Sequence, residues 1–131
     1  MTRDNAEIVR RGFEAWNRSD DDALPTYFSP DVEIDASDRV LNPAVYRGLE
    51  GARRFRSEIS ETWGGFRVEI EELRASGDDR VVAFVRVSGE GRASGAAVDA
   101  RSAWLARVAE GKVTHLRLYR DRSEALAAVS A

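Results

Sequence analysis

The only histidine of the chain, His115, lies six residues before Asp121. A histidine oriented by a carboxylate is a common acid–base pair in enzymes, so these two residues are the first candidates for chemistry. The segment around the histidine, residues 112–119, alternates polar and apolar residues as an extended strand does. On a strand that rises about 3.3 Å per residue, the two side chains would lie about 20 Å apart and could not form a hydrogen-bonded pair. We expect His115 on the outer face of a sheet, and Asp121 or Ser123 as the cap of a short helix over residues 121–129.

Arg86 is a second candidate because its charge conflicts with its surroundings. It occurs in the β-branched segment 80–89 and shares one face of that expected strand with Val82 and Phe84. An isolated arginine in a protein interior is costly, so Arg86 would need a carboxylate partner or an anionic ligand. If the end of the strand curves outward instead, the guanidinium extends to water and has no special role. The sequence leaves both interpretations open.

Asp35 is the candidate catalytic base. Strict alternation with Val32 and Ile34 would point Ala36, and not Asp35, into the interior. A β-bulge would reverse this orientation, and bulges are frequent beside active sites. In an apolar pocket the carboxylate would become more basic and could remove a proton from a carbon next to a carbonyl group. In the alternative interpretation, Asp35 is an exposed carboxylate on a strand.

The elements that must position these residues follow from the hydrophobic periodicity, which changes from helical to strand-like at about residue 65. The expected helices are residues 2–20, 21–28, 49–63 and 121–129, and the expected strands are residues 31–37, 66–75, 80–89, 96–108 and 112–119. Asp4 is the expected cap of the first helix, and residues 38–48 are expected to be irregular. Consecutive strands joined by tight turns pair antiparallel, and the helices must cover one face of the sheet. The predicted fold is a single α+β domain, residues 1–131, in which about three helices wrap a curved, mostly antiparallel sheet.

The composition limits the classes of function. A chain of 131 residues, 43% hydrophobic and 33% charged, is typical of one globular domain. Acidic residues separate the small groups of arginines and the net charge is −3, so we expect no nucleic acid partner. With no cysteine and one histidine, thiolate and histidine-rich metal sites are excluded, and we predict neither a metal nor a cofactor. No apolar run is long enough to span a membrane, so we expect no membrane partner and a cytoplasmic location.

Four short motifs are spread along nearly the whole chain, namely Trp16-Asn17, Phe28 with Asp31-Val32, Tyr46-Arg47-Gly48, and Trp104 with Gly111-Lys112. With these motifs the chain resembles the SnoaL-like group of the nuclear-transport-factor-2-like superfamily. This superfamily includes steroid isomerases, polyketide cyclases and epoxide hydrolases, and the motifs specify its fold more than any reaction. The resemblance implies that helices and sheet enclose a pocket, and that two copies of the chain associate through the sheet.

The residues that perform catalysis in those enzymes are altered in this chain. By resemblance, the tyrosine on the first helix of steroid isomerases corresponds to Gly12, and their protonated aspartate corresponds to Ser102. Their aspartate base falls near Asp35 and Ala36. The aspartate that the cyclase and epoxide hydrolase types place on the last strand corresponds to Leu118. We therefore expect that the chain is not an efficient steroid isomerase.

Apolar residues from several elements are expected to surround a pocket for an apolar or aromatic small molecule. The predicted pocket residues are Trp16, Phe55, Ile59, Phe84, Arg86, Ser102, Trp104, Leu116 and Leu118. Asp38 and Arg39 lie in the loop that would form its mouth, where they would pair with each other or contact a ligand. The leading interpretation is a small-molecule-binding, enzyme-like protein of the isomerase or cyclase type, whose reaction the sequence does not specify. The main alternative is a non-catalytic ligand-binding or dimerisation module, and each of the apolar residues could also belong to an ordinary filled core.

The outer face of the sheet is expected to contact a second copy of the chain. On this face the alternation would place apolar residues of three strands, namely Val81, Ala83, Val85, Val87, Ala103, Leu105 and Tyr119. A surface of this kind is too apolar to remain in water, so the sequence predicts a homodimer through the sheet.

Overall fold

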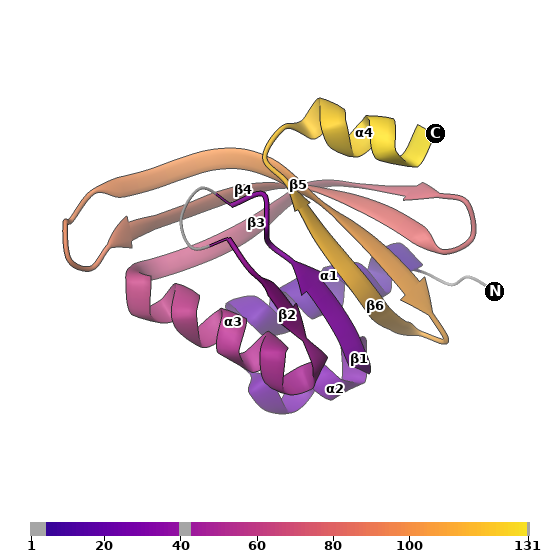
Figure 1. Ribbon diagram of the computed structural model, residues 1–131, viewed down its shortest axis with the longest axis horizontal. Coiled ribbons are helices and arrows are strands. Elements are labelled where there is room, and N and C mark those ends of the chain that lie inside the picture. Colours follow the sequence, from indigo (N-terminus) through magenta and orange to yellow (C-terminus); the bar gives the residue numbers. More distant parts are fainter. Residues whose placement is uncertain (1–4, 40–42, 131) are drawn as a thin grey trace.

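The protein has an α+β fold in which a curved sheet covers a layer of helices (Figure 1). The computed structural model describes residues 5–39 and 43–130. The helices are α1 (Asn5–Asn17), α2 (Leu24–Tyr27), α3 (Gly48–Thr62) and α4 (Arg122–Ser130), with a 3₁₀ turn, η1, at Asp21–Ala23. The strands are β1 (Phe28–Asp35), β2 (Val45–Arg47), β3 (Trp63–Ser76), β4 (Arg80–Gly91), β5 (Ala97–Ala109) and β6 (Lys112–Tyr119). The predicted fold class is confirmed.

The strands form one six-stranded sheet in the order β2-β1-β6-β5-β4-β3. Strands β3 to β6 pair antiparallel with their neighbours in sequence, as expected for strands joined by short turns. The pairing of β1 with β6 is parallel and brings the first long strand beside the last. Strand β2 pairs antiparallel with β1 and lies in the region 38–48 that we expected to be irregular. Three residues are too few to show an alternating pattern, so β2 could not be detected from the sequence.

Helices α1, α2 and α3 lie on one side of the sheet, and α4 lies on the other (Figure 1). Helix α1 buries Val9, Gly12, Phe13 and Ala15, which recur at helical spacing on one face. Its expected cap, Asp4, lies outside the described residues. Within the part of the chain that the structure describes, no helix is both long enough and apolar enough to cross a membrane.

Two polar contacts fix the N-terminal helices in place. The Asn17 side-chain amide donates to the carbonyl oxygen of Val68 at 2.7 Å and accepts from the Val68 N–H at 2.9 Å, so the end of α1 is tied to β3. The Arg56 guanidinium of α3 donates to both carboxylate oxygens of Asp21, at 2.7 and 2.8 Å. This bidentate contact joins α3 to the turn before α2. The first contact therefore holds α1 against the sheet, and the second holds α3 against the neighbouring turn.

The long strand β4 is buried on both faces, and this explains one wrong prediction. Val81, Ala83 and Val85 belong to the main core between sheet and helices, whereas Val82 and Phe84 pack beneath α4. The expected outer face was therefore wrong for Val81, Ala83, Val85 and Val87, which lie on the helix side. The register decides the orientation, because Ala83 pairs with Trp104 and Phe84 pairs with Ala103. When a strand is apolar on both faces, its own sequence does not indicate which face lies towards the helices and which lies on the other side of the sheet.

Candidate functional site

A cavity of about 330 Å³ lies between the sheet and helices α1 and α3. This volume is at the lower end of the range of about 300–1,000 Å³ that is typical of small-molecule sites. Its inner part is formed by buried side chains such as Phe13, Phe28 and Ile34. Its other end is formed by exposed residues, among them Arg101 and Arg120. The cavity is therefore apolar inside and charged where it meets the surface.

Most of the predicted pocket residues lie around this cavity. The lining includes Trp16, Phe55, Ile59, Ser102, Trp104, Leu116 and Leu118. On β6, Leu116 and Leu118 are buried against the cavity while His115 and Arg117 are exposed on the opposite face. The alternating period of a strand accounts for this separation. The chain has three tryptophans, Trp16, Trp63 and Trp104, and all three line the cavity.

Phe55 of α3 is the centre of an aromatic wall. Its ring centroid lies 4.9 Å from those of Trp16 and Tyr46, and 6.1 Å from that of Trp104. The Tyr46 ring is stacked on it, whereas the two indole rings are tilted or edge-on. Such arrangements are favourable beyond the burial of apolar area. The wall is thus a rigid surface against which a flat apolar ring can pack.

Arg39 adds a positive charge to this wall. Its guanidinium carbon lies 5.2 Å from the ring centroid of Phe55 and 5.9 Å from that of Tyr46. It donates a hydrogen bond to the Tyr46 hydroxyl at 3.0 Å, and the same hydroxyl donates a short hydrogen bond to Glu58. Burial, together with the hydrogen bond to Glu58, raises the pKa of Tyr46. The phenol therefore stays protonated and connects the guanidinium to a carboxylate on α3.

The remaining polar groups of the lining are two arginines and a serine. Arg101 forms an ion pair with Glu71 at 3.1 Å, and Arg120 lies 3.8 Å from a carboxylate oxygen of Asp38. Ser102 is 8% exposed and precedes Trp104 on the cavity face of β5. Counting only described residues, the ionisable side chains of the lining are all arginines. In the same part of the chain no three histidine, aspartate or glutamate side chains gather as a metal site would require.

Phe84 and Arg86 do not face the cavity, and the prediction that they do is wrong. Phe84 packs with Ala103 against Ala125 of α4, on the other side of the sheet. Arg86 is on the same side and donates to both oxygens of Asp99, at 2.8 and 2.6 Å, with its side chain 43% exposed. This bidentate bond holds the pKa of Asp99 below its ordinary value and raises the pKa of Arg86. The carboxylate partner that we considered for Arg86 exists, but at the surface.

Asp35 also lies outside the cavity, contrary to the inward orientation that its predicted role as a base requires. The pairing of β1 with β6 is irregular between Phe28 and Glu33, before Asp35, and Ala36 is the buried neighbour. The Asp35 carboxylate accepts hydrogen bonds from the backbone N–H and the hydroxyl of Ser37. These bonds hold its pKa below the ordinary value, against a smaller opposing effect of burial. A carboxylate with a lowered pKa is a weaker base than the predicted role requires.

His115 and Asp121 form no pair, as the strand geometry predicted. His115 is exposed on the outer face, where its Nδ1 lies 3.0 Å from the hydroxyl of Thr114. Asp121 accepts hydrogen bonds from the backbone N–H and the hydroxyl of Ser123, at 2.9 and 2.6 Å. It precedes the first residue of α4, so its prediction as a helix cap is confirmed.

Trp63 and Arg39 are two of the lining residues that were missing from the predicted pocket. Trp63 follows Phe55 and Ile59 in the apolar stripe of the expected helix, so the periodicity already contained the signal that would have included it. Arg39 was assigned to the loop at the mouth, but its contact with the aromatic wall depends on the position of Tyr46 in β2. Because β2 could not be detected in the sequence, neither could this contact.

The profile of the SnoaL-like domain family matches residues 9–116, which is most of the chain. This protein belongs to the SnoaL-like domain family. An uncharacterized protein of Mycobacterium tuberculosis is 32% identical to this SnoaL-like domain over 120 residues, which cover 88% of each chain. The fold is of the nuclear transport factor 2-like and ketosteroid isomerase-like kind.

Two solved structures illustrate the range of relatives of this SnoaL-like domain. A proposed SnoaL-like polyketide cyclase of Jannaschia sp. CCS1 is 25% identical, with a TM-score of 0.76, and the match covers 97% of this chain and 92% of that one. A hypothetical protein of Catenulispora acidiphila with a ketosteroid isomerase-like fold, solved in complex with trimethylamine, is 22% identical with a TM-score of 0.78. That match covers 95% of this chain and 93% of that chain and shows the shared fold.

In this SnoaL-like domain, the position that resembles the tyrosine of steroid isomerases lies close to a neighbouring ring. A Cβ atom added to Gly12 would lie 3.1 Å from Cζ of Phe28, so a side chain at this position would require the Phe28 ring to shift by a few tenths of an ångström. The other two corresponding positions, Ser102 and Leu118, do line the cavity. By the resemblance, the interior has a hydroxyl and an aliphatic side chain where the steroid isomerase and cyclase types have carboxyl groups.

Proposed function

We propose that this protein binds an apolar, ring-containing small molecule in the cavity between the sheet and helices α1 and α3. The supporting observation is the cavity of about 330 Å³, whose wall is formed by the rings around Phe55. Burial of apolar surface contributes about 25 cal/mol per Å², so a flat ring packed against this wall gains affinity over its whole contact area. The complex of a relative of the same fold with trimethylamine supports a small molecule as the class of ligand.

The polar groups of the lining favour binding over proton transfer. Guanidinium groups stay protonated at neutral pH and only donate hydrogen bonds, and an isolated hydroxyl such as that of Ser102 is a weak base. These groups can orient a carbonyl oxygen or hold an anion, whereas an isomerase or cyclase also needs a group that takes up a proton. We therefore place non-catalytic ligand binding first. A cyclase-type reaction, as suggested for the Jannaschia relative, is the alternative.

The fluorescence of the three tryptophans provides the test, because all of them line the cavity. We expect naphthalene-2-carboxamide, a neutral two-ring probe, to change this fluorescence saturably. Val98→Phe at the half-exposed end of the lining should weaken binding about tenfold by obstructing the cavity. The same substitution at Val129 of α4, which packs against the opposite face of the sheet, is the matched control and should leave binding unchanged. No saturable change in the wild type, or equal binding by both variants, would contradict the proposal.

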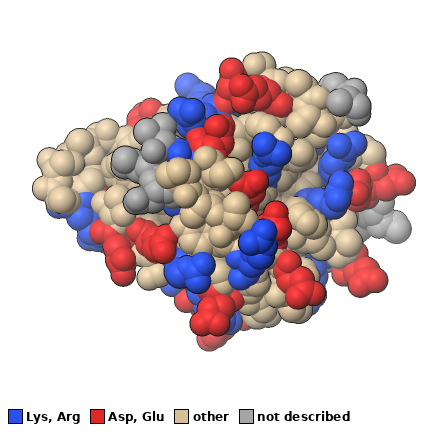
Figure 2. All heavy atoms as spheres, in the orientation of Figure 1, with Lys and Arg blue, Asp and Glu red and all other residues tan. Residues whose placement is uncertain are grey.

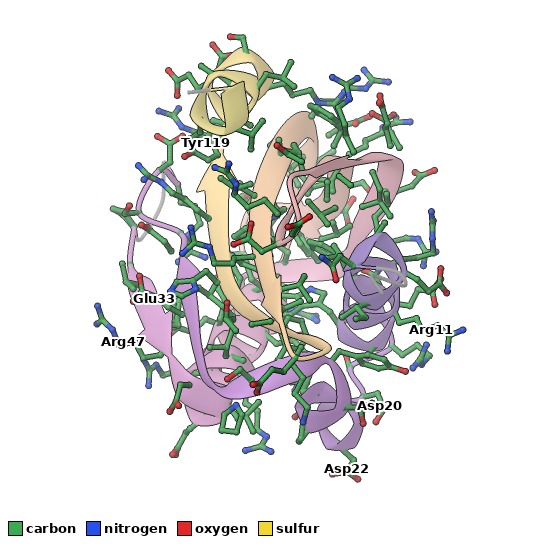
Figure 3. All side chains as sticks on the ribbon, turned by 90° about the vertical axis from the view of Figure 1, so that its right-hand side faces the viewer. Arg11, Asp20, Asp22, Glu33, Arg47 and Tyr119 are labelled. Atoms are coloured by element: carbon green, nitrogen blue, oxygen red, sulfur yellow. The ribbon has the colours of Figure 1, made fainter. Side chains whose placement is uncertain are left out.

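We further propose that two copies associate through the part of the outer sheet face that α4 leaves open. Figure 3 shows Tyr119 directly beneath α4, whereas Glu33 lies beside Arg47 at the far edge of the sheet. The open part carries the acidic residues Glu33 and Asp35 on β1 next to His115 and Arg117 on β6. Basic and acidic side chains are similarly interspersed over the face seen in Figure 2.

A two-fold axis through this face would place the acidic strand of one copy against basic residues of the other, which supports the dimer. Sedimentation at micromolar concentration should give a particle of twice 14.5 kDa. A particle of 14.5 kDa would count against this assembly.

A further inference from the structure

Within the described residues, the ionisable side chains that line the cavity carry positive charge only. Arg39 lies at the aromatic wall, and Arg101 and Arg120 lie at the exposed end. The carboxylates that pair with the latter two, Glu71 and Asp38, are not among the lining residues. A molecule inside the cavity therefore experiences a positive potential in apolar surroundings, where charges interact more strongly than in water.

Arg39 is held more firmly than the other two arginines. Its guanidinium lies against the rings of Phe55 and Tyr46 and donates to the Tyr46 hydroxyl, so its orientation is fixed before any ligand arrives. The side chains of Arg101 and Arg120 are 60% and 59% exposed, and water screens charges at that level of exposure. Arg39 is the cation best placed to bind a charged group inside the cavity.

The contacts of Arg39 are compatible with a bound anion. A guanidinium carries five N–H donors in a planar fork, so it can serve the Tyr46 hydroxyl and a carboxylate at the same time. The Tyr46 hydroxyl also donates to Glu58, which lines a separate hollow beyond the tyrosine together with Arg54. The negative charge of Glu58 is therefore outside the cavity.

We infer that the cavity selects an apolar ring compound with one anionic group, and that Arg39 binds the anion while the aromatic wall packs against the ring. The inference rests on the proposed function, because it requires a small molecule in this cavity. The class of ligand is an aromatic or cyclic carboxylate. Bidentate hydrogen bonding by arginine favours a planar carboxylate over a neutral amide of the same shape.

The test compares naphthalene-2-carboxylate with naphthalene-2-carboxamide, two probes of the same shape that differ in charge. In the wild type, the carboxylate should bind at least tenfold more tightly, which corresponds to about 1.4 kcal/mol. The cation 2-naphthylmethylammonium should bind more weakly than either. Arg39→Met, which keeps an apolar stem, should lower carboxylate affinity about tenfold and leave carboxamide affinity unchanged. Tryptophan fluorescence and titration calorimetry measure all of these dissociation constants.

Arg54→Met is the matched control. Arg54 lies 5.4 Å from the centroid of the same Tyr46 ring and 3.9 Å from Glu58, but it is 57% exposed and does not line the cavity. Its loss removes the same charge from the same ring and carboxylate, so the variant should keep the full preference for the carboxylate.

The outcomes separate the anion site from the proposed function. If both naphthalene probes bind the wild type equally, the proposed function stands and the anion site is overturned, whatever the stability of Arg39→Met. If the preference survives in Arg39→Met, or if that variant weakens both probes equally, Arg39 is not the anchor. If neither probe binds, the proposed function fails and the anion site fails with it.

Discussion

Replacement of Phe55 by leucine removes the ring at the centre of the aromatic wall and leaves an apolar side chain in its place. Phe55 is 5% exposed and lies within pairing distance of the rings of Trp16, Tyr46 and Trp104. Phe28 is a matched control, because it is also 5% exposed and also lines the cavity. Among the described residues it takes part in no ring pair. The difference between Phe55→Leu and Phe28→Leu therefore isolates the aromatic contacts.

The expected magnitude follows from these contacts. Exchange of one buried apolar side chain for another of similar size costs less than about 1.5 kcal/mol, so Phe28→Leu should cost about 1 kcal/mol. Phe55→Leu has this cost and also loses three ring pairs, each contributing about 0.5–1.5 kcal/mol beyond burial. It further loses the contact with Arg39, which contributes about 0.5–1 kcal/mol. Taking the lower limits, because neighbouring rings will move towards the leucine, the additional loss is about 2 kcal/mol. Phe55→Leu should therefore cost about 3 kcal/mol in total.

Urea unfolding followed by far-ultraviolet circular dichroism is the appropriate assay. Tryptophan fluorescence is unsuitable here, since the substitution changes the surroundings of Trp16 and Trp104 directly. The free energies of unfolding are comparable only if the two variants and the wild type share the same dependence on urea concentration. The substitution should also reduce the preference for naphthalene-2-carboxylate, because the Phe55 ring helps to orient Arg39.

The reasoning is refuted if the two variants lose stability equally, within about 0.5 kcal/mol, which approaches the error of the extrapolation. Equal losses would mean that the rings around Phe55 contribute through their buried area alone. In that case the wall would have no special rigidity, and its role as a packing surface for a flat ligand would lose its support.

Three further predictions concern polar contacts. Arg56 lowers the pKa of Asp21 below its unfolded value, so Asp21→Asn should destabilise the protein by about 1 kcal/mol at pH 7. In urea titrations, the difference in unfolding free energy between this variant and the wild type should vanish as the pH falls below about 4 and Asp21 becomes protonated. A difference that stays constant with pH would contradict this prediction. Arg86→Met should change stability by less than about 1 kcal/mol in urea unfolding and leave probe binding unchanged, because its ion pair lies at the surface opposite the cavity; weaker binding would contradict this placement. Asn17→Ala should lower the free energy of unfolding by about 2–4 kcal/mol in the same assay, because the N–H and carbonyl groups of buried Val68 lose their hydrogen-bond partners. A decrease of less than about 1 kcal/mol would show that water replaces the side chain.

The periodicity of the sequence was sufficient for most of the elements and for part of the cavity. Helix α1 was expected over residues 2–20 and spans Asn5–Asn17, and the antiparallel strands from β3 to β6 were each expected near their observed positions. The strict alternation of β6 correctly separated Leu116 and Leu118 from His115. These predictions succeed because a strand or helix with one buried face must repeat its apolar residues at the period of its backbone.

The sequence by itself determined which segments form helices and strands, and which face of a one-sided element is apolar. It could not determine the orientation of β4, because that strand is buried on both faces and only its register with β5 places Phe84 and Arg86 away from the cavity. Nor could it determine the contact of Arg39 with Tyr46, which requires the pairing of β2 with β1. Both features depend on the pairing of separate segments, and local periodicity contains no information on such pairing. The tertiary structure therefore decided which arginine lies at the cavity wall, placing Arg39 there and Arg86 on the opposite side of the sheet.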